Sequence, residues 1–286
     1  MALNPAAVGA EWETAPKSWT SKDALLYALG VGVGIDDPYA DLEYSTENSH
    51  DLPQRVLPTF AAVLAQTTTS TGSPDLGELV PEALLHAEQS VRLYRPLPTA
   101  GTVNSTSRIV AMHDKGRDGV IVTETESRDA VTAEPLYATS TSVFVRGGGG
   151  FGGERGEASP WPEPESEPDR VVEMVTRPDQ ALLYRLSGDR NPLHSDPRFA
   201  AKAGFDRPIS HGMCTFGITG RALLAAVCDN DPARFGEFSV RFSKPTYPGR
   251  TLRVAMWIND DHVRFRTYDG DAIVLDRGVF RWANRA

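Results

Sequence analysis

An internal repeat limits the fold of this chain more than any other feature. Three segments recur in the same order, and the two copies of each share residue types: Tyr27–Leu29 with Tyr184–Leu186, Pro58–Phe60 with Cys214–Phe216, and Ser90–Pro96 with Ser239–Pro245. Each copy of the last segment is followed by a glycine and then by an alternating, strand-like run. The sequence therefore predicts two copies of one structural unit.

Each copy is expected to hold a buried helix followed by strands. Residues 212–227 are apolar on nearly all sides, as in a helix that a sheet wraps around. Four alternating segments follow, separated by turn signals: Phe238–Phe242, Thr251–Ile258, His262–Tyr268 and Ile273–Trp282. A long buried helix wrapped by an antiparallel sheet is the hot-dog pattern, so two copies predict an α+β double hot dog.

The two units are expected to be joined by a linker. Residues 147–168 are rich in glycine, then in proline, glutamate and serine, and such a composition cannot bury a core. We therefore expect an N-terminal unit at 1–146 and a C-terminal unit at 169–286.

Composition excludes several classes of function. A net charge of −9 argues against nucleic acid as a partner. No run of about 18 apolar residues is present, so no membrane span is expected. The segment Met1–Pro16 lacks the pattern of a secretory signal. Cys214 and Cys228 lie in an apolar stretch without metal spacing, as expected for reduced thiols in a cytoplasmic protein.

The segment Tyr184–His194 concentrates the chemistry. It places Asp189, Asn191 and His194 within six residues, and Gly188 and Pro192 interrupt what would otherwise be a helix. These side chains are therefore expected in a sharply bent loop between two helix ends. A carboxylate beside an imidazole is the minimal set for general acid/base catalysis on a bound water.

The second helix is expected to begin with Asp196 as its N-cap and Pro197 at its first position, and to stop at Gly204. Metal binding by Asp189, Asn191, His194 and Asp196 is disfavoured. The order lacks the glycine of a calcium loop and the paired histidines of a zinc helix, and Asp196 is explained as a cap.

Residues Tyr184 to Ala200 meet every position of the hydratase 2 signature of the MaoC-like family. The chain therefore resembles that family, and within it the hydratase domains of the peroxisomal multifunctional enzymes type 2. Further segments carry the resemblance: Tyr27–Gly32, Leu57–Phe60, His86–Gln89, Tyr94–Pro98, Asp114–Gly116, Gly150–Gly153 and Phe242–Pro245. One residue departs from it, because the position after His86 is usually glycine and is Ala87 here.

The resemblance implies a double hot dog and a lyase of fatty-acid metabolism, including beta-oxidation: an (R)-specific enoyl-CoA hydratase that converts trans-2-enoyl-CoA into (3R)-3-hydroxyacyl-CoA. Asp189 and His194 would share the water, with either as the base, and Asn191 would orient Asp189 or the water. The Gly212 amide, at a helix N-terminus, would hold the developing enolate oxygen. His211 is expected to be a hydrogen-bonded structural residue.

The resemblance also implies a set of acyl-CoA contacts: His86, Ala87, Lys115, Arg190, Pro192, Leu193 and Phe242. In the N-terminal half, residues 31–35 offer no acid/base pair at the matching position, so that half is expected to supply a cavity for the acyl chain. No metal or other cofactor is required besides the CoA thioester substrate. A homodimer is expected from the family.

Three alternatives remain open. The same chemistry could run as dehydration in fatty-acid synthesis, with acyl carrier protein as the partner. A non-catalytic acyl-thioester-binding hot-dog protein is disfavoured by the complete set of Asp189, Asn191 and His194. A hot-dog thioesterase would not need the hydratase 2 signature.

Overall fold

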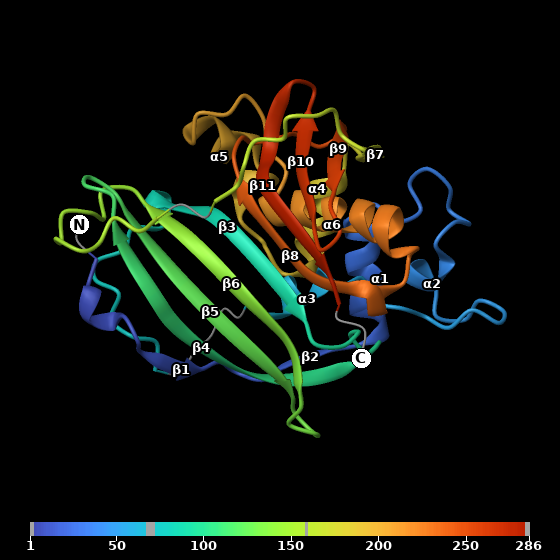
Figure 1. Ribbon diagram of the computed structural model, residues 1–286, viewed down its shortest axis with the longest axis horizontal. Helices are drawn as coiled ribbons and strands as arrows, with labels where there is room; N and C mark the ends of the chain where they lie inside the picture. Colours follow the sequence, from blue (N-terminus) through green and yellow to red (C-terminus); the bar gives the residue numbers. More distant parts are fainter. Residues whose placement is uncertain (1–2, 67–71, 158–159, 284–286) are drawn as a thin grey trace.

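The computed structural model describes residues 3–66, 72–157 and 160–283. In these ranges the chain forms an eleven-stranded sheet and six α-helices (Figure 1). The helices are α1 (Ser21–Gly30), α2 (Leu42–Ser45), α3 (Phe60–Leu64), α4 (Gln180–Tyr184), α5 (Pro197–Lys202) and α6 (Gly212–Cys228). No helix in the described part of the chain has both the length and the apolarity needed to cross a bilayer.

The first half of the chain supplies β1 (Glu11–Glu13), β2 (Lys17–Trp19), β3 (Leu84–Leu93), β4 (Gly101–Asp114), β5 (Gly119–Asp129) and β6 (Pro135–Val145). The second half supplies β7 (Arg170–Val175), β8 (Phe235–Phe242), β9 (Thr251–Ile258), β10 (Val263–Asp269) and β11 (Ala272–Trp282). Strands β8 to β11 and the long helix α6 agree with the ranges expected from the sequence to within three residues at each end, whereas β7 was not predicted.

The strand order is the same in each half when each half is followed from its outer edge of the sheet toward the junction. The sheet runs β1-β4-β5-β6-β3-β8-β11-β10-β9-β7, with β2 also paired to β4. Thus β4-β5-β6-β3 and β9-β10-β11-β8 are matching four-stranded sheets, joined where β3 lies antiparallel to β8. In Figure 1 the green strands spread to one side of this junction and the red strands stand on the other. The duplicated pattern expected from the repeat is therefore present in the topology.

The register at the junction identifies the axis that relates the two halves. Ser90 lies directly opposite Ser239, and these are the two serines that begin the repeated segment. Matched helices follow the same relation, because α3 packs on β3 and β6 while α6 packs on β8 and β11. The matched tyrosines Tyr27 and Tyr184 also contact each other, with ring centroids 6.2 Å apart.

The helices differ between the halves. Helix α6 has 17 residues, most of them buried, and agrees with the predicted helix. Its counterpart α3 has only five residues, so the long N-terminal helix of the expected fold is much shorter here. The sequence after Gln66 is a run of threonine, serine and glycine, residues of low helix propensity; residues 67–71 lie outside the described part of the chain.

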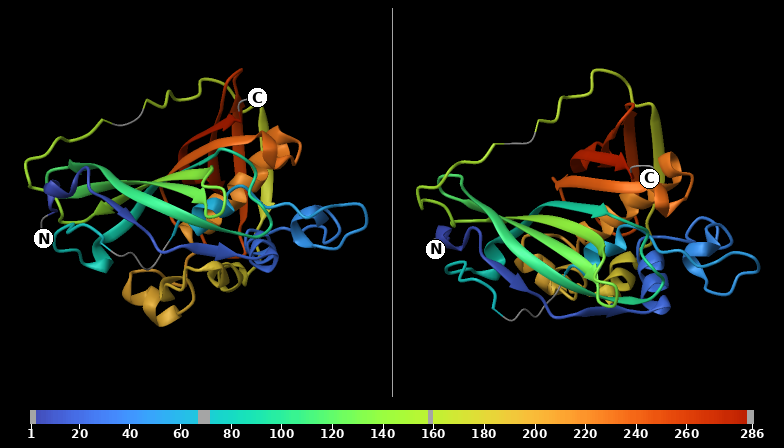
Figure 2. Two further views of the ribbon diagram at one scale, coloured as in Figure 1. Left: turned by 90° about the horizontal axis from the view of Figure 1, so that it is seen from below. Right: turned by 60° about the horizontal axis from the view of Figure 1, so that its bottom comes forward.

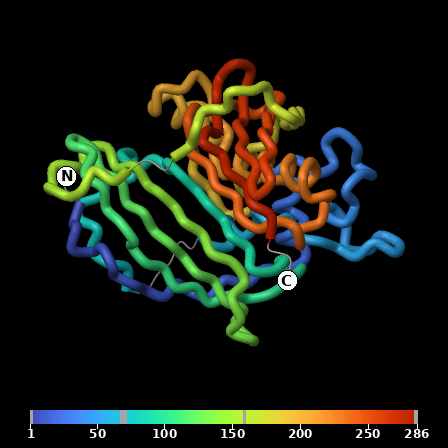
Figure 3. Tube along the Cα trace, in the orientation of Figure 1, coloured from blue at the N-terminus to red at the C-terminus, as the bar shows by residue number. Residues whose placement is uncertain are grey.

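The connection between the halves contains no helix or strand in its described residues, 146–157 and 160–169. It runs outside both halves in the two views of Figure 2, and the tube in Figure 3 shows it passing from the green strands across the front of the red strands. Both its ends are held. Asp114 accepts hydrogen bonds from the Gly150 and Gly152 amides (3.0 and 2.8 Å), and the Trp161 indole donates to the Gly278 carbonyl of β11 (3.1 Å).

Two glycines let α6 lie close to the N-terminal half. A Cβ at Gly217 would meet Val31 Cγ1 at 2.5 Å and the Tyr27 hydroxyl at 2.6 Å, and one at Gly220 would meet Thr59 Cγ2 at 2.3 Å. The Tyr27 hydroxyl and Thr59 are themselves hydrogen-bonded in the core (2.9 Å). Side chains at these positions would push α6 away from the residues that link the halves.

We predict that Gly217→Ala lowers the free energy of unfolding by about 1–3 kcal/mol through overpacking, although alanine favours a helix over glycine by about 1 kcal/mol. Urea denaturation of the full chain measures this. The control is Ala225→Gly at an exposed position of α6, which should cost only the helix propensity, about 1 kcal/mol. A Gly217→Ala protein as stable as the parent would contradict the close approach.

Candidate active site

A bent loop between α4 and α5 carries the predicted acid/base residues. Helix α4 continues as a 3₁₀ turn, Arg185–Ser187, and stops at Gly188, whose φ of 143° is readily adopted only by glycine. A second 3₁₀ turn, Pro192–His194, follows, and then Asp196 caps α5 by accepting from the Arg198 amide at 2.8 Å. The break, the cap and the stop at Gly204 are as predicted.

This loop brings Asp189 and His194 against the start of α6. One donor or acceptor atom from each of Asp189, His194 and His211 lies within 4.8 Å of the others. The His194 and His211 rings are in close contact, with centroids 3.8 Å apart and planes tilted by 32°. His211 is the residue before Gly212, so the cluster lies directly at the N-terminus of α6.

His194 is held in one tautomer. Its Nδ1 lies 2.9 Å from the Ile209 carbonyl oxygen. A carbonyl only accepts, so Nδ1 carries the proton and Nε2 keeps its lone pair. The residue is 9% exposed, and burial lowers its pKa, with the nearby Asp189 charge opposing that shift. His194 is therefore neutral near pH 7, with one nitrogen able to take a proton.

His211 ties the loop to the helix. Its Nε2 donates to the Asp189 backbone carbonyl (3.3 Å), and its ring also lies 5.0 Å from the Tyr184 ring. Burial, and then the neighbouring His194, lower its pKa to about 4. The hydrogen bond matches the structural role predicted from the sequence, whereas the contact with His194 was not predicted.

Gly212, Phe242 and His86 form the side of the cluster that faces the N-terminal half. A Cβ at Gly212 would lie 3.1 Å from the Phe242 ring, and that ring lies 4.7 Å from His86. Burial lowers the pKa of His86 to about 4, and the Asp189 charge acts on it in the opposite direction. Its Nε2 is buried without a hydrogen-bond partner in the described structure. Ala87, next in the chain, occupies a bulge of β3.

Other residues of the predicted site lie differently. The Asn191 side chain is exposed, and its oxygen accepts a hydrogen bond from the Leu193 amide (3.0 Å). The side chain therefore caps a turn and does not orient Asp189. The Asn191 backbone amide donates to the Asp189 carboxylate (3.0 Å). Arg190 and Pro192 are exposed beside the cluster, and Leu193 is half-buried.

Lys115 is not beside the cluster. It lies in the β4–β5 turn, beyond β6 and β5 from His86, and its ammonium donates to the backbone carbonyls of Arg155 and Gly156 in the connection. In this arrangement its charge holds the connecting segment.

The cluster holds groups that can exchange protons. His194 Nδ1 and His211 Nε2 already donate to carbonyls, so each ring has one nitrogen left that can accept a proton. These two rings and the Asp189 carboxylate lie together at the start of α6.

Two hollows flank the loop. One, of about 220 Å³, is lined by Pro178, Ala181, Leu182, His194, Ser195, Arg207, Pro208 and Pro248. The other, of about 230 Å³, is lined by Lys17, Ser18, Trp19, Asp23, Leu26, Phe60, Val63, Leu64, Leu186, Ser187 and Gly188. The second hollow lies between α1, α3 and the residue before Asp189, and most of its side chains are apolar.

Comparisons with known proteins cover both halves. Residues 18–147 match the family described as MFE-2 hydratase 2 N-terminal domain, and residues 160–276 match the MaoC like domain. The chain is 44% identical to 3-hydroxyacyl-thioester dehydratase Y of Mycobacterium tuberculosis over 293 residues, 99% of each protein. It is also 44% identical to enoyl-CoA hydratase ChsH3 of the same organism, over 88% of this chain and 87% of the relative.

Solved structures agree. A MaoC-like dehydratase from Phytophthora capsici aligns over 98% of each chain with a TM-score of 0.87 and 31% identity. A Mycobacterium tuberculosis protein described as having a double hot-dog fold aligns with a TM-score of 0.56 at 14% identity, over 96% of each chain, which shows the fold alone.

The lowered histidine pKa values predict a loss of stability in mild acid. In the unfolded chain these histidines become protonated near pH 6.5, whereas in the folded chain they do so only at lower pH. The free energy of unfolding is therefore unaffected by these histidines above pH 6.5 and falls as the pH drops below it. For His211, the decline between pH 7 and pH 5 is about 2 kcal/mol. We expect His211→Gln to flatten the pH dependence of urea unfolding by about this amount.

The matched control is His50→Gln, because the His50 side chain is 93% exposed. This variant should keep the pH dependence of the parent protein. Equal slopes for the parent and His211→Gln would show that His211 is not held neutral by the fold.

Proposed function

The chain belongs to the MaoC-like family, and from that premise we propose that it adds water to trans-2-enoyl-CoA to give (3R)-3-hydroxyacyl-CoA in fatty-acid metabolism. The observation that carries the proposal is the convergence of Asp189, a neutral His194 and the N-terminus of α6 at one point. The reaction is reversible, so the same groups serve dehydration, the direction in the name of the Mycobacterium tuberculosis dehydratase.

The reaction has three requirements. The double bond of an enoyl thioester is electrophilic at C3, but water is a weak nucleophile and must be oriented and deprotonated. The electrons then rest on the thioester oxygen, which needs hydrogen-bond donors. Finally, C2 must receive a proton. These requirements call for a base, a second proton-handling group and an oxyanion site.

The base is His194. Its Nδ1–H is fixed on the Ile209 carbonyl, so Nε2 is left as the acceptor, and its lowered pKa keeps it unprotonated at neutral pH. Asp189 supplies the second acceptor for the water and stabilises the imidazolium that forms. The water oxygen bonds to C3 while one water proton passes to His194, and the pair then returns a proton to C2.

The oxyanion site is the start of α6. The first N–H groups of a helix have no acceptor within the helix, and the helix dipole favours negative charge there. Gly212 has no side chain, so a thioester carbonyl can approach its amide closely beside Phe242. Because Asp189 and His194 come from one loop, water and proton reach one face of the double bond, and a single enantiomer results.

We assign the acyl chain to the hollow in the N-terminal half that is lined mainly by α1 and α3. This hollow begins at Gly188, next to Asp189, and extends between α1 and α3. The shortness of α3 supports this assignment, because a longer helix at this position would occupy more of the half's interior. We therefore assign substrate binding to the unit at 1–146 and catalysis to the unit at 169–286, with 147–168 as linker; residues 158–159 lie outside the described ranges.

Coenzyme A is the proposed carrier of the substrate, as the name of the relative ChsH3 supports. A homodimer and a cytoplasmic location are part of the proposal. They are supported by the exposed valines Val171 and Val175 on the edge strand β7, and by the two free, buried thiols.

We predict that the purified chain removes the absorbance of the conjugated enoyl thioester, and that Asp189→Asn and His194→Gln each lower the turnover by about 10² or more while the fold is retained. Both changes keep size and polarity. Coenzyme A and carrier-protein substrates are compared in the same assay. The control is Asp206→Asn, an exposed carboxylate in the neighbouring loop, which should keep the parent turnover.

The product is expected to be the (3R) alcohol. Coupling to an (S)-specific 3-hydroxyacyl-CoA dehydrogenase should therefore yield no NADH, and substantial NADH would overturn the stereochemical assignment. Unchanged turnover in either acid/base variant would remove the assigned roles.

The acyl-chain assignment predicts a change in chain-length preference. Leu26→Trp adds bulk in the hollow between α1 and α3, and should lower kcat/KM for long enoyl substrates by about tenfold or more while sparing the four-carbon substrate. Leu29→Trp, on the same helix but 38% exposed, is the control and should leave the preference unchanged. Equal losses for all chain lengths would place the acyl chain elsewhere.

A further inference from the structure

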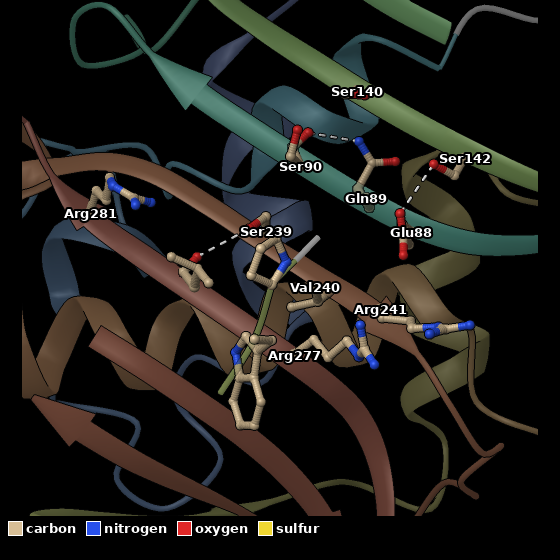
Figure 4. Close-up of a pocket in the computed structure, with 13 residues that line it drawn as sticks. Glu88, Gln89, Ser90, Ser140, Ser142, Ser239, Val240, Arg241, Arg277 and Arg281 are labelled. Atoms are coloured by element: carbon tan, nitrogen blue, oxygen red, sulfur yellow. Dashed lines mark hydrogen bonds between the residues drawn. The ribbon is translucent and has the colours of Figure 1, made fainter. Parts of the chain in front are cut away.

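A polar hollow of about 350 Å³ lies at the junction of the two halves, away from the proposed active site. Residues of β3, β6, β8 and β11 line it (Figure 4). Pro160 and Trp161 of the connection also belong to its lining. Along β8, Phe238 and Val240 are buried in the core, whereas Ser239 and Arg241 alternate with them and face outward. The hollow is therefore on the face of the sheet opposite α6.

Three arginines line this hollow: Arg241, Arg277 and Arg281. Figure 4 shows Arg241 and Arg277 extending toward the same part of it, with Arg281 at the other end. In the described residues, the ion pairs of the protein include neither Arg241 nor Arg281. The lining carboxylate is Glu88, which accepts from the Ser142 hydroxyl (3.3 Å). Three arginines and one carboxylate thus line the hollow in the described part of the chain.

The backbone is bent to aim Arg277 at the hollow. Its φ is 52°, a left-handed conformation that a long side chain rarely adopts. The register of β11 against β8 shifts between Asp276 and Val279, so Arg277 sits in a β-bulge, a device that redirects a side chain. The Asp276 carboxylate holds the bulge by accepting from the Arg277 amide (2.9 Å) and from Arg266 Nε (2.6 Å).

The connecting segment completes the hollow. The Trp161 indole donates to the carbonyl of Gly278, the residue after Arg277, and the Arg266 guanidinium lies 4.5 Å from the indole centroid. The position of this wall is therefore fixed relative to the bulge. On the strands, the hydroxyls of Ser90 and Ser140 supply further hydrogen-bond donors. The Ser239 hydroxyl donates to the Val279 carbonyl (3.4 Å) and can accept a hydrogen bond.

We propose that this hollow is a second binding site, for a small phosphorylated molecule. Guanidinium groups match the geometry and charge of phosphate oxygens, and serine hydroxyls complete such sites. The volume is that of a small ligand pocket. The site lies on the other face of the sheet from Asp189 and His194, so it is independent of the proposed hydratase reaction.

Titration calorimetry of the full chain with inorganic pyrophosphate tests this site. We expect binding that weakens as salt is added, since exposed charges are screened. Arg241→Gln and Arg277→Asn should each weaken the affinity at least tenfold, and asparagine tolerates the left-handed backbone at 277. Arg128→Gln, which removes the same charge from exposed β5, should bind like the parent. Hydratase turnover without pyrophosphate should be unchanged in all three.

Absence of binding in the millimolar range at low salt would overturn the proposal. Unchanged affinity of Arg241→Gln for pyrophosphate would also overturn it. Arg241 is a surface residue, so this variant tests the site even if Arg277→Asn unfolds. Lys115→Gln tests whether pyrophosphate binds elsewhere, at the β4–β5 turn. If Lys115→Gln abolishes binding and Arg241→Gln does not, the ligand occupies that turn and the proposed site at the junction is wrong.

Discussion

The pairing of β3 with β8 is the interaction on which the rest of this structure depends. It places Ser90 opposite Ser239, joins two matching four-stranded sheets and sets the axis about which the halves are related. It also brings His86, from the first half, against Phe242 of the second. A shift of one residue in this register would turn alternate side chains to the other face of the sheet and separate that pair. The shape of the site therefore follows from backbone pairing between the halves.

The two halves share one architecture but differ in the residues and in the helix length at matching positions. At the position of the Asp189–His194 loop, the first half has residues 31–35, which contain no titratable side chain, and its α3 is a single short helix. The second half keeps the long helix, whose N-terminus supplies the positive end of a dipole. In the proposed reaction the long α6 polarises the thioester carbonyl, and the hollow between α1 and the short α3 takes the acyl chain.

Much of this could be predicted from residue patterns. The turn residues and caps around Gly188 and Asp196 fixed the loop, and continuous apolar character identified α6, because both signals are local. The role of Ile209 could not be predicted, since His194 is held by its backbone carbonyl and not by its side chain. Asn191 was predicted to orient Asp189 or the water. Its side-chain oxygen caps a local turn, and its backbone amide donates to the Asp189 carboxylate, whereas a role toward the water stays a prediction. The length of α3, the contact of His211 with His194, and the contact of Lys115 with the connecting segment depend on tertiary packing, which motif spacing does not report.

The connecting segment, held at Asp114 and at Trp161, makes the association of the halves intramolecular. Two separate copies of one unit would meet only at their solution concentration, whereas a short tether gives an effective concentration in the millimolar range. A pair of identical copies would also carry every substitution twice. Joined in one chain, the halves can change independently: one can lose its acid/base pair and shorten its helix while the other keeps both.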